Sequence, residues 1–110
     1  MDITFADKKL QKIVNDDRKM IKELGKIRAE KLNIRLTQMQ DAVTFEDLRY
    51  LSGNYHELTG DRKGQWACDL DQPYRLIFKP HEDPIPINKY VQYIWLEIMG
   101  VEIIEIVDYH

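Results

Sequence analysis

The chain has few of the residues that stabilise proteins covalently, with a single cysteine, Cys68, among its 110 residues. One cysteine cannot form an internal disulfide or a cysteine-rich zinc site, which excludes a disulfide-stapled secreted scaffold and a zinc ribbon. The sequence also lacks a run of roughly 20 apolar residues that could span a membrane, and its N-terminus lacks the basic-then-apolar order of a secretory signal. We therefore expect a soluble, cytoplasmic protein that does not contact a membrane and whose folding rests on packing.

Glycine and proline are also scarce, with five and four residues, whereas 44% of the chain is apolar and 32% is charged. These proportions are typical of a globular domain and argue against a wholly disordered chain. The length is close to the commonest domain size, which leaves no room for separate catalytic and regulatory halves. The sequence predicts one domain over residues 1–110.

An overall excess of basic residues, the usual electrostatic sign of a nucleic-acid-binding protein, is missing as well, because the net charge is −3. The charge is nevertheless unevenly distributed along the sequence. Residues 1–40 carry a net charge of +4, residues 41–70 carry −3 and residues 71–110 carry −4. The N-terminal part can therefore present a cationic face although the whole chain is acidic.

Apolar periodicity predicts helices in the N-terminal part. Alternation over residues 3–5 indicates a short strand, and Asp7 is a good N-cap for a helix that follows it. Apolar side chains then recur at helical spacing over residues 20–39, which predicts one long amphipathic helix weakened in its middle by Gly25. Its lysines are typical of a solvated face, with an RNA-binding face as the less common alternative.

The second half has the pattern of a sheet. Thr44 predicts the start of a short helix that ends at Gly53. Three segments rich in aromatic and branched residues then indicate an antiparallel meander: residues 55–59, 65–70 and 74–78. A proline-containing irregular connection follows, and residues 101–110 have apolar side chains on both faces, as an interior strand would.

Cationic residues in this half suit an anionic ligand. The loop at residues 60–64 has two glycines around adjacent cations, an arrangement that suits a phosphate but is more often a charged hairpin turn. Arg75 lies inside an apolar strand, where an unpaired guanidinium is costly. It therefore points to solvent or meets an anion, which is either a substrate phosphate or a carboxylate such as Asp69 or Asp108.

Histidines provide the candidates for acid–base chemistry. His56 lies in an alternating segment, where a lone histidine is more often structural than catalytic. Strand alternation places Asp108 and His110 on one face, so the carboxylate can orient the imidazole, unless the terminus is simply frayed. A nucleophilic pair of Cys68 with a histidine, or a zinc site of two histidines and Asp108, stays open, although no local spacing supports either.

The sequence resembles a known family in three places: Tyr-His-Glu-Leu-Thr-Gly-Asp-Arg-Lys-Gly-Gln-Trp at 55–66, Tyr-Arg-Leu-Ile-Phe at 74–78, and the ending Val-Asp-Tyr-His at 107–110. Together these segments resemble the HigB-type, or plasmid-maintenance killer, toxins of the RelE superfamily. The N-terminal part agrees with the family in pattern only. The resemblance implies an α+β, RelE-like fold in which N-terminal helices pack on a small antiparallel β-sheet.

The resemblance also implies a function and partners. HigB-type toxins belong to bacterial type II toxin–antitoxin systems and cut mRNA on the ribosome by attack of a ribose 2′-OH on the adjacent phosphate, without a metal or other cofactor. The expected partners are the ribosome, mRNA and a helix-turn-helix, HigA-like antitoxin, with DNA bound only through the antitoxin complex. The alternative is a degenerate relative, a catalytically inactive module that only binds an antitoxin or RNA.

Roles for individual residues follow from the same resemblance. His56 and the terminal residues match the family's functional positions, so His56 and His110 become the acid–base candidates. The remaining assignments complete the expected site: Asp108 orients or assists a base, Tyr109 contacts the nucleotide, Arg75 stabilises the phosphate, and Arg62 and Lys63 position RNA. The connection over residues 80–100 is longer than in the shortest relatives, either as an added contact with antitoxin or ribosome or as a larger loop.

Overall fold

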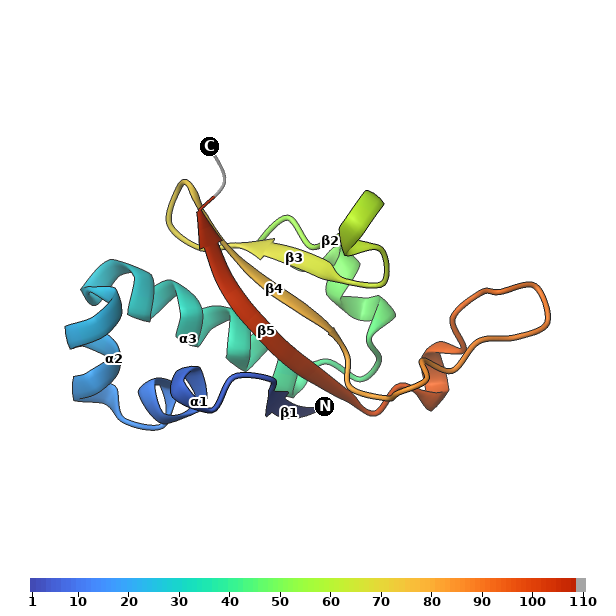
Figure 1. Cartoon of the computed structure of the whole chain (residues 1–110), viewed down its shortest axis with the longest axis horizontal. Coiled ribbons are helices and arrows are strands. Elements are labelled where there is room, and N and C mark those ends of the chain that lie inside the picture. The colour runs from blue at the N-terminus through green and yellow to red at the C-terminus, as the bar shows by residue number, and fades with distance from the viewer. Residues whose placement is uncertain (109–110) are drawn as a thin grey trace.

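Helices lie on one face of a five-stranded sheet in the computed structural model, which describes residues 1–108 (Figure 1). The strand order is β1-β5-β4-β3-β2. The strands are β1 Asp2–Phe5, β2 His56–Glu57, β3 Trp66–Asp69, β4 Tyr74–Pro80 and β5 Gly100–Asp108. Strands β2 to β5 pair antiparallel, and β1 adds a parallel pairing with β5, so the sheet is mixed. The expected α+β fold, its meander and its interior last strand are confirmed.

Helices begin where the sequence provides a cap. The Asp7 carboxylate accepts a hydrogen bond from the backbone of Lys9 at the start of α1 (Lys8–Val14), and Asp16 caps α2 (Asp17–Leu24) in the same way. The prediction of one continuous helix over residues 20–39 is wrong. Gly25 adopts a φ of +84°, which ends α2 and starts α3 (Lys26–Asp41), because this backbone conformation is open to glycine and incompatible with a helix.

The core lies between the helices and one side of the sheet. Alternate residues of β3 and β4 point into it, and Trp66, Leu76 and Phe78 are completely buried there. The short segment between α3 and β2 adds to this core through a 3₁₀ helix, Glu46–Tyr50. This helix follows Phe45 rather than Thr44 directly, and it ends three residues before the predicted end at Gly53. Thr44 and Asp47 bond reciprocally, each side chain accepting from the other residue's backbone N–H.

A buried arginine ties α3 to the strand segment that carries the candidate site. Arg35 is 8% exposed, and it donates hydrogen bonds to the backbone oxygens of Asp69, at 2.7 Å, and Ser52, at 3.1 Å. Gly53 allows this approach, since a Cβ at that position would lie 2.7 Å from the guanidinium carbon. Position 53 also has a φ of +123°, which other residues rarely adopt. The guanidinium therefore fixes the backbone next to Asp69.

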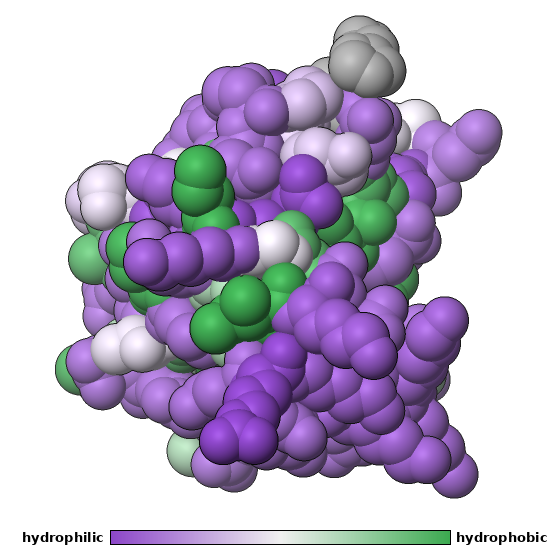
Figure 2. Space-filling view, turned by 90° about the vertical axis from the view of Figure 1, so that its left-hand side faces the viewer, coloured by the Kyte–Doolittle hydropathy of each residue, from purple (hydrophilic) through white to green (hydrophobic). Residues whose placement is uncertain are grey.

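Two surfaces stand out from this framework. Figure 2 shows apolar side chains grouped among hydrophilic ones on the face where the helices lie, and the exposed apolar residues of α2 and α3 include Ile21, Ile27 and Ile34. The basic N-terminal part thus forms a mixed surface rather than a purely cationic one. At the other end of the molecule, the connection between β4 and β5 projects beyond the sheet (Figure 1). It contains one isolated bridge, between Ile87 and Tyr93, and a 3₁₀ helix, Trp95–Glu97.

Candidate functional site

The side of the sheet that faces away from the helices carries three of the five predicted site residues that lie within residues 1–108, namely His56, Arg62 and Arg75. Strand pairing places His56 opposite Ala67, Ala67 opposite Ile77, and Ile77 opposite Glu105. These four residues form a row across β2, β3, β4 and β5, and directly opposed residues share a face. We call this side the open face. Polar groups at both ends of the row flank a floor formed by Ala67 and Ile77, both completely buried.

Arg75 is also on the open face, two residues along β4 from Ile77. It is paired across the sheet with Asp69 on β3 and Val107 on β5, and its Nε lies 3.3 Å from the Asp69 carboxylate. The sequence left open whether its anion is structural or a substrate phosphate, and the structure supplies a structural one, Asp69. Strand spacing separates the Cα atoms of Arg75 and His56 by roughly 12 Å. Two side chains of this length can therefore reach one phosphate from opposite sides.

His56 is held in a defined tautomer. Its Nδ1 lies 2.7 Å from the backbone oxygen of Asn54, and a carbonyl oxygen only accepts hydrogen bonds, so Nδ1 carries the proton. In the neutral ring, Nε2 then has the lone pair. Asn54 presents its carbonyl from a left-handed conformation, with a φ of +54°. The imidazole is half-buried at the end of the row, and this arrangement suits a general base that accepts a proton at Nε2.

The loop between β2 and β3 brings a second arginine to the open face. A 3₁₀ helix, Gly60–Arg62, forms most of the loop. Arg62 donates a hydrogen bond of 2.9 Å to the Gln65 side chain and lies 3.6 Å from the carboxylate of Glu105 on β5. Its guanidinium therefore reaches over the buried floor, whereas Lys63 is exposed. The loop is the charged hairpin connection that the sequence allowed, with Arg62 directed to the predicted site.

The C-terminal candidates are placed only in part. Asp108 is the last residue of β5 and pairs with Tyr74. It therefore lies on the same side of the sheet as Ile106 and Leu76, which is the side covered by the helices. His56 and Arg75 have the opposite parity. Strand register thus does not bring Asp108 into their row. The predicted roles of Tyr109 and His110 fall on residues outside the described part of the chain.

The Cys68 side chain is on the core side of β3 and completely buried, facing away from His56. Burial raises the pKa of this thiol to about 12, while the nearby Arg35 guanidinium acts in the opposite direction. The thiol is therefore protonated at neutral pH, and it cannot serve as the nucleophile that the sequence left open. Burial likewise raises the pKa of the neighbouring Tyr55 hydroxyl.

These two groups predict a loss of stability at alkaline pH. The neutral Cys68 thiol is favoured in the folded state, so its contribution is complete below about pH 9 and is lost as the pH rises toward 12. We expect the free energy of unfolding to fall by about 1.4 kcal/mol per pH unit for this group between those limits. Urea unfolding at a series of pH values measures the slope. The variant Cys68→Ala should have a shallower slope, with the remainder from Tyr55, and an unchanged slope would contradict the assignment.

Other site types receive no support from the described residues. Residues 1–108 contain no cluster of three or more histidine, cysteine, aspartate or glutamate side chains that could hold a metal ion. His110, a member of the zinc site considered above, lies outside that range. None of the helices within residues 1–108 has the length and apolar character needed to cross a membrane.

Comparison with solved structures identifies the class of fold. The chain is similar to the YoeB/ParE toxin from Agrobacterium tumefaciens, with a TM-score of 0.60, 12% identity and full coverage of both chains. It is also similar to the YoeB-YefM complex from Staphylococcus aureus, with a TM-score of 0.57, 15% identity, and coverage of 100% of this chain and 97% of the other. At these identities the likeness establishes a RelE-like toxin fold.

The sequence identifies the family. Residues 3–94 match the model of the HigB-like toxins, the RelE-like toxins of type II toxin–antitoxin systems of the HigB kind. The chain therefore belongs to this family, as the segments at 55–66 and 74–78 predicted. The matched span ends before β5 and so excludes the terminal Asp-Tyr-His. No curated protein sequence matches the chain significantly.

Sequence reasoning missed one member of the open face, Glu105. This carboxylate lies at the end of the row and holds Arg62 across the sheet. Its signal was the pair of glutamates, Glu102 and Glu105, in a strand that is mostly apolar, because both mark the side of β5 that is not packed against the helices.

Proposed function

We propose that this toxin is a ribosome-dependent mRNA endonuclease that acts in the cytoplasm and cleaves RNA on the open face of its sheet. The observation that carries the proposal is the pairing of a base and a cation on one face. His56 has its Nδ1 proton committed to Asn54, and Arg75 lies roughly 12 Å away on the same side. A phosphodiester between them meets a proton acceptor on one side and a guanidinium on the other.

The proposed reaction uses these two groups, an acid from the C-terminal segment and the RNA itself. His56 Nε2 removes the proton of the ribose 2′-OH, the 2′-oxygen bonds to phosphorus, and the bond from phosphorus to the 5′-oxygen breaks. An acid, for which His110 is the candidate, protonates the departing 5′-oxygen, and Tyr109 contacts the nucleotide. Asp108, which strand register places on the other side of the sheet, has no part in this step. Arg75 stabilises the charge that develops on the phosphate, and Arg62 and Lys63 position the strand.

An antitoxin is the second expected partner. Type II toxins are paired with antitoxins by definition of the family, and one structural neighbour is a YoeB-YefM complex. We propose a helix-turn-helix, HigA-like antitoxin that neutralises the toxin, with DNA bound only through the joint complex. The gene beside this one offers an inexpensive check, because a small helix-turn-helix reading frame should be present there.

The 5′ ends of translated mRNAs, mapped in cells after induction of the toxin, test the proposed function. We expect induction of the wild type to arrest growth and to create new, codon-linked 5′ ends on translated messages. His110→Ala should abolish these ends, because the acid for the leaving oxygen is removed. Identical behaviour of the two proteins would exclude the catalytic assignment of His110, and an absence of new ends in the wild type would contradict the nuclease itself.

The variant Arg75→Ala tests whether Arg75 contacts a substrate phosphate as well as the Asp69 carboxylate. We expect Arg75→Ala to slow cleavage of ribosome-bound mRNA by about 10²-fold, the usual effect of losing one donor to a developing charge. The matched control is the double variant Arg75→Ala/Asp69→Asn, which removes the carboxylate left behind and should restore stability without restoring the rate. A folded, fully active Arg75→Ala protein would exclude the phosphate contact.

One observation favours a second candidate, a binding module without catalytic activity. Both arginines of the open face are engaged by carboxylates, Arg75 with Asp69 and Arg62 with Glu105. Such pairing lowers the positive potential that a phosphate encounters. The wild-type measurement in cells decides between the two, because the module binds its partner but produces no new RNA ends.

A further inference from the structure

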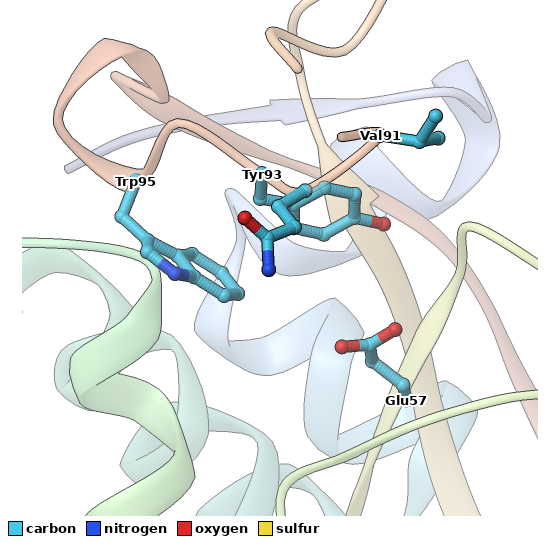
Figure 3. A pocket seen from close by; sticks show the side chains of 5 residues that line it. Glu57, Val91, Tyr93 and Trp95 are labelled. Carbon is cyan, nitrogen blue, oxygen red and sulfur yellow. The ribbon is translucent and has the colours of Figure 1, made fainter. Parts of the chain in front are cut away.

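A hollow of about 540 Å³ lies beyond the edge strand β2, on the side of the sheet opposite His56 (Figure 3). Its walls come from Glu57 on β2 and from the projecting connection, through Val91, Gln92, Tyr93 and Trp95. Figure 3 shows the rings of Tyr93 and Trp95 and the side chain of Val91 along the connection, with the Glu57 carboxylate facing them across the opening. The volume falls within the range of small-molecule sites.

The aromatic wall is fixed by packing. The rings of Tyr93 and Trp95 meet edge to face, with centroids 5.1 Å apart at 74°. Behind them, Trp95 stacks on the buried Phe45 ring at 6.4 Å and 18°, and meets Trp66 edge to face at 6.1 Å. These contacts hold flat apolar surfaces in place at the rim of the hollow, where both Tyr93 and Trp95 are partly exposed. Such surfaces suit a planar ring that stacks.

The polar groups of the hollow are oriented too. Arg49 donates a 2.7 Å hydrogen bond to Glu57 Oε1 and lies over the Trp66 and Trp95 rings, so it both neutralises and positions this carboxylate. A carboxylate has room for several donors. On the opposite side, the Asn88 side chain donates a hydrogen bond of 3.1 Å to the Gln92 side-chain oxygen. Because this oxygen already has a donor, the Gln92 NH₂ group is the part that can donate to a ligand. The hollow thus combines one oriented acceptor with one oriented donor.

A buried donor lies directly behind this wall. The Trp66 ring nitrogen is completely buried and makes no well-formed hydrogen bond within residues 1–108. Burial raises the pKa of the Tyr93 hydroxyl, and hydrogen bonding with the Trp66 side chain acts in the opposite direction. A buried N–H without a well-formed hydrogen bond is uncommon in a folded protein, and the Tyr93 hydroxyl is the group of the wall that interacts with it.

We propose that this hollow binds an unpaired guanine base of RNA. Guanine has two adjacent N–H donors, which suit the Glu57 carboxylate, next to one carbonyl acceptor, which suits the Gln92 amide, while its ring stacks on the aromatic wall. Uracil offers a single donor to the carboxylate, and adenine and cytosine place an acceptor beside their amino group. The inference rests on the proposed function, because its ligand is the RNA. Glu57 follows His56 on the edge strand β2 but points to the other side of the sheet, so the RNA that carries this base passes around the β2 edge to reach the open face.

Binding of mononucleotides tests the site without any cleavage. In ligand-observed NMR titrations of the whole protein, we expect GMP to bind more tightly than UMP, and UMP more tightly than AMP or CMP. Glu57→Gln should remove most of the preference for GMP, and Gln92→Leu should weaken GMP binding as a second, independent variant. Trp95→Leu should weaken all four by about ten-fold through the loss of stacking. The matched control Tyr90→Ser changes an exposed residue of the same connection and should alter nothing.

Two results separate this inference from the nuclease assignment. GMP binding that depends on Glu57, in a protein that produces no RNA ends, would support the base site and contradict the nuclease. Conversely, the base site is overturned if the four nucleotides bind the wild type equally, whether or not it cuts mRNA, or if Glu57→Gln leaves the binding order unchanged. Each outcome is informative because binding and cleavage are measured separately.

Discussion

Replacement of His56 with glutamine is expected to slow cleavage of ribosome-bound mRNA by about 10²–10⁴-fold, the range for loss of a general acid–base group. The physical reason is the fixed tautomer. Nδ1 donates to the Asn54 carbonyl at 2.7 Å, so Nε2 is the only ring atom able to accept the 2′-OH proton. A glutamine amide keeps a polar side chain of similar size at this half-buried position but cannot take up a proton. Single-turnover rates at equal concentrations of wild type and variant give the ratio.

The matched control for His56→Gln is Lys79→Ala. Lys79 is on the same open face but is paired with Glu102 at 3.5 Å and has no part in the proposed reaction. Its removal should change the rate by no more than a few-fold. If His56→Gln cut at the wild-type rate, His56 would be a structural residue of the edge strand, which is the commoner role of a lone strand histidine.

Replacement of Arg35 with alanine is expected to lower the free energy of unfolding by about 3–5 kcal/mol. The loss arises because the guanidinium, 8% exposed, bonds the backbone oxygens of Asp69 and Ser52. The Asp69 oxygen loses this donor in the variant, whereas the Gln38 side chain still donates to Ser52. A cavity is created at the same time. Arg35→Lys should be destabilised as well, because a single ammonium cannot reproduce the fork of the guanidinium.

A second arginine on the same helix provides the comparison. Arg28 bonds the Asp71 carboxylate at 3.0 Å and lies over the Tyr74 ring, but it is 21% exposed and touches side chains rather than the backbone. We expect Arg28→Ala to cost about 1 kcal/mol. Urea unfolding followed by tryptophan fluorescence measures both variants, and equal losses for Arg35→Ala and Arg28→Ala would contradict the assignment of Arg35 as the anchor.

Local signals predicted the elements well. Asp7, Thr44 and the segments of the meander all mark elements that the structure contains, because caps and strand propensity act over a few residues. Gly25 was recognised as a weak point, but whether a glycine bends or breaks a helix depends on where the helices on either side find their packing partners. Parallel pairing of β1 with β5 joins residues about a hundred positions apart and has no local signal.

The residues of the open face were named from the motif and not from strand alternation. His56, Arg62 and Arg75 were all named from the sequence, and the structure brings them to one face. Placement of Asp108 needed the register of β5, which shifts between Ile77 and Phe78 of its partner strand, and one extra residue exchanges the two faces of a strand. The hollow beside β2 was not predictable for a similar reason. The sequence indicates only that Trp95 is a core residue, and its position at the rim depends on the path of the connection between β4 and β5.

The chemistry of the RNA ends tests the central claim most directly. Attack by a 2′-OH must leave a 2′,3′-cyclic phosphate on the upstream fragment and a hydroxyl on the downstream 5′ end, because the 2′-oxygen replaces the 5′-oxygen on phosphorus. We therefore expect translated messages cut by the wild-type toxin to carry 5′-hydroxyl ends, which accept phosphate from a kinase without prior dephosphorylation. Downstream fragments with 5′-phosphate ends would contradict the account, because water rather than the ribose would then be the nucleophile.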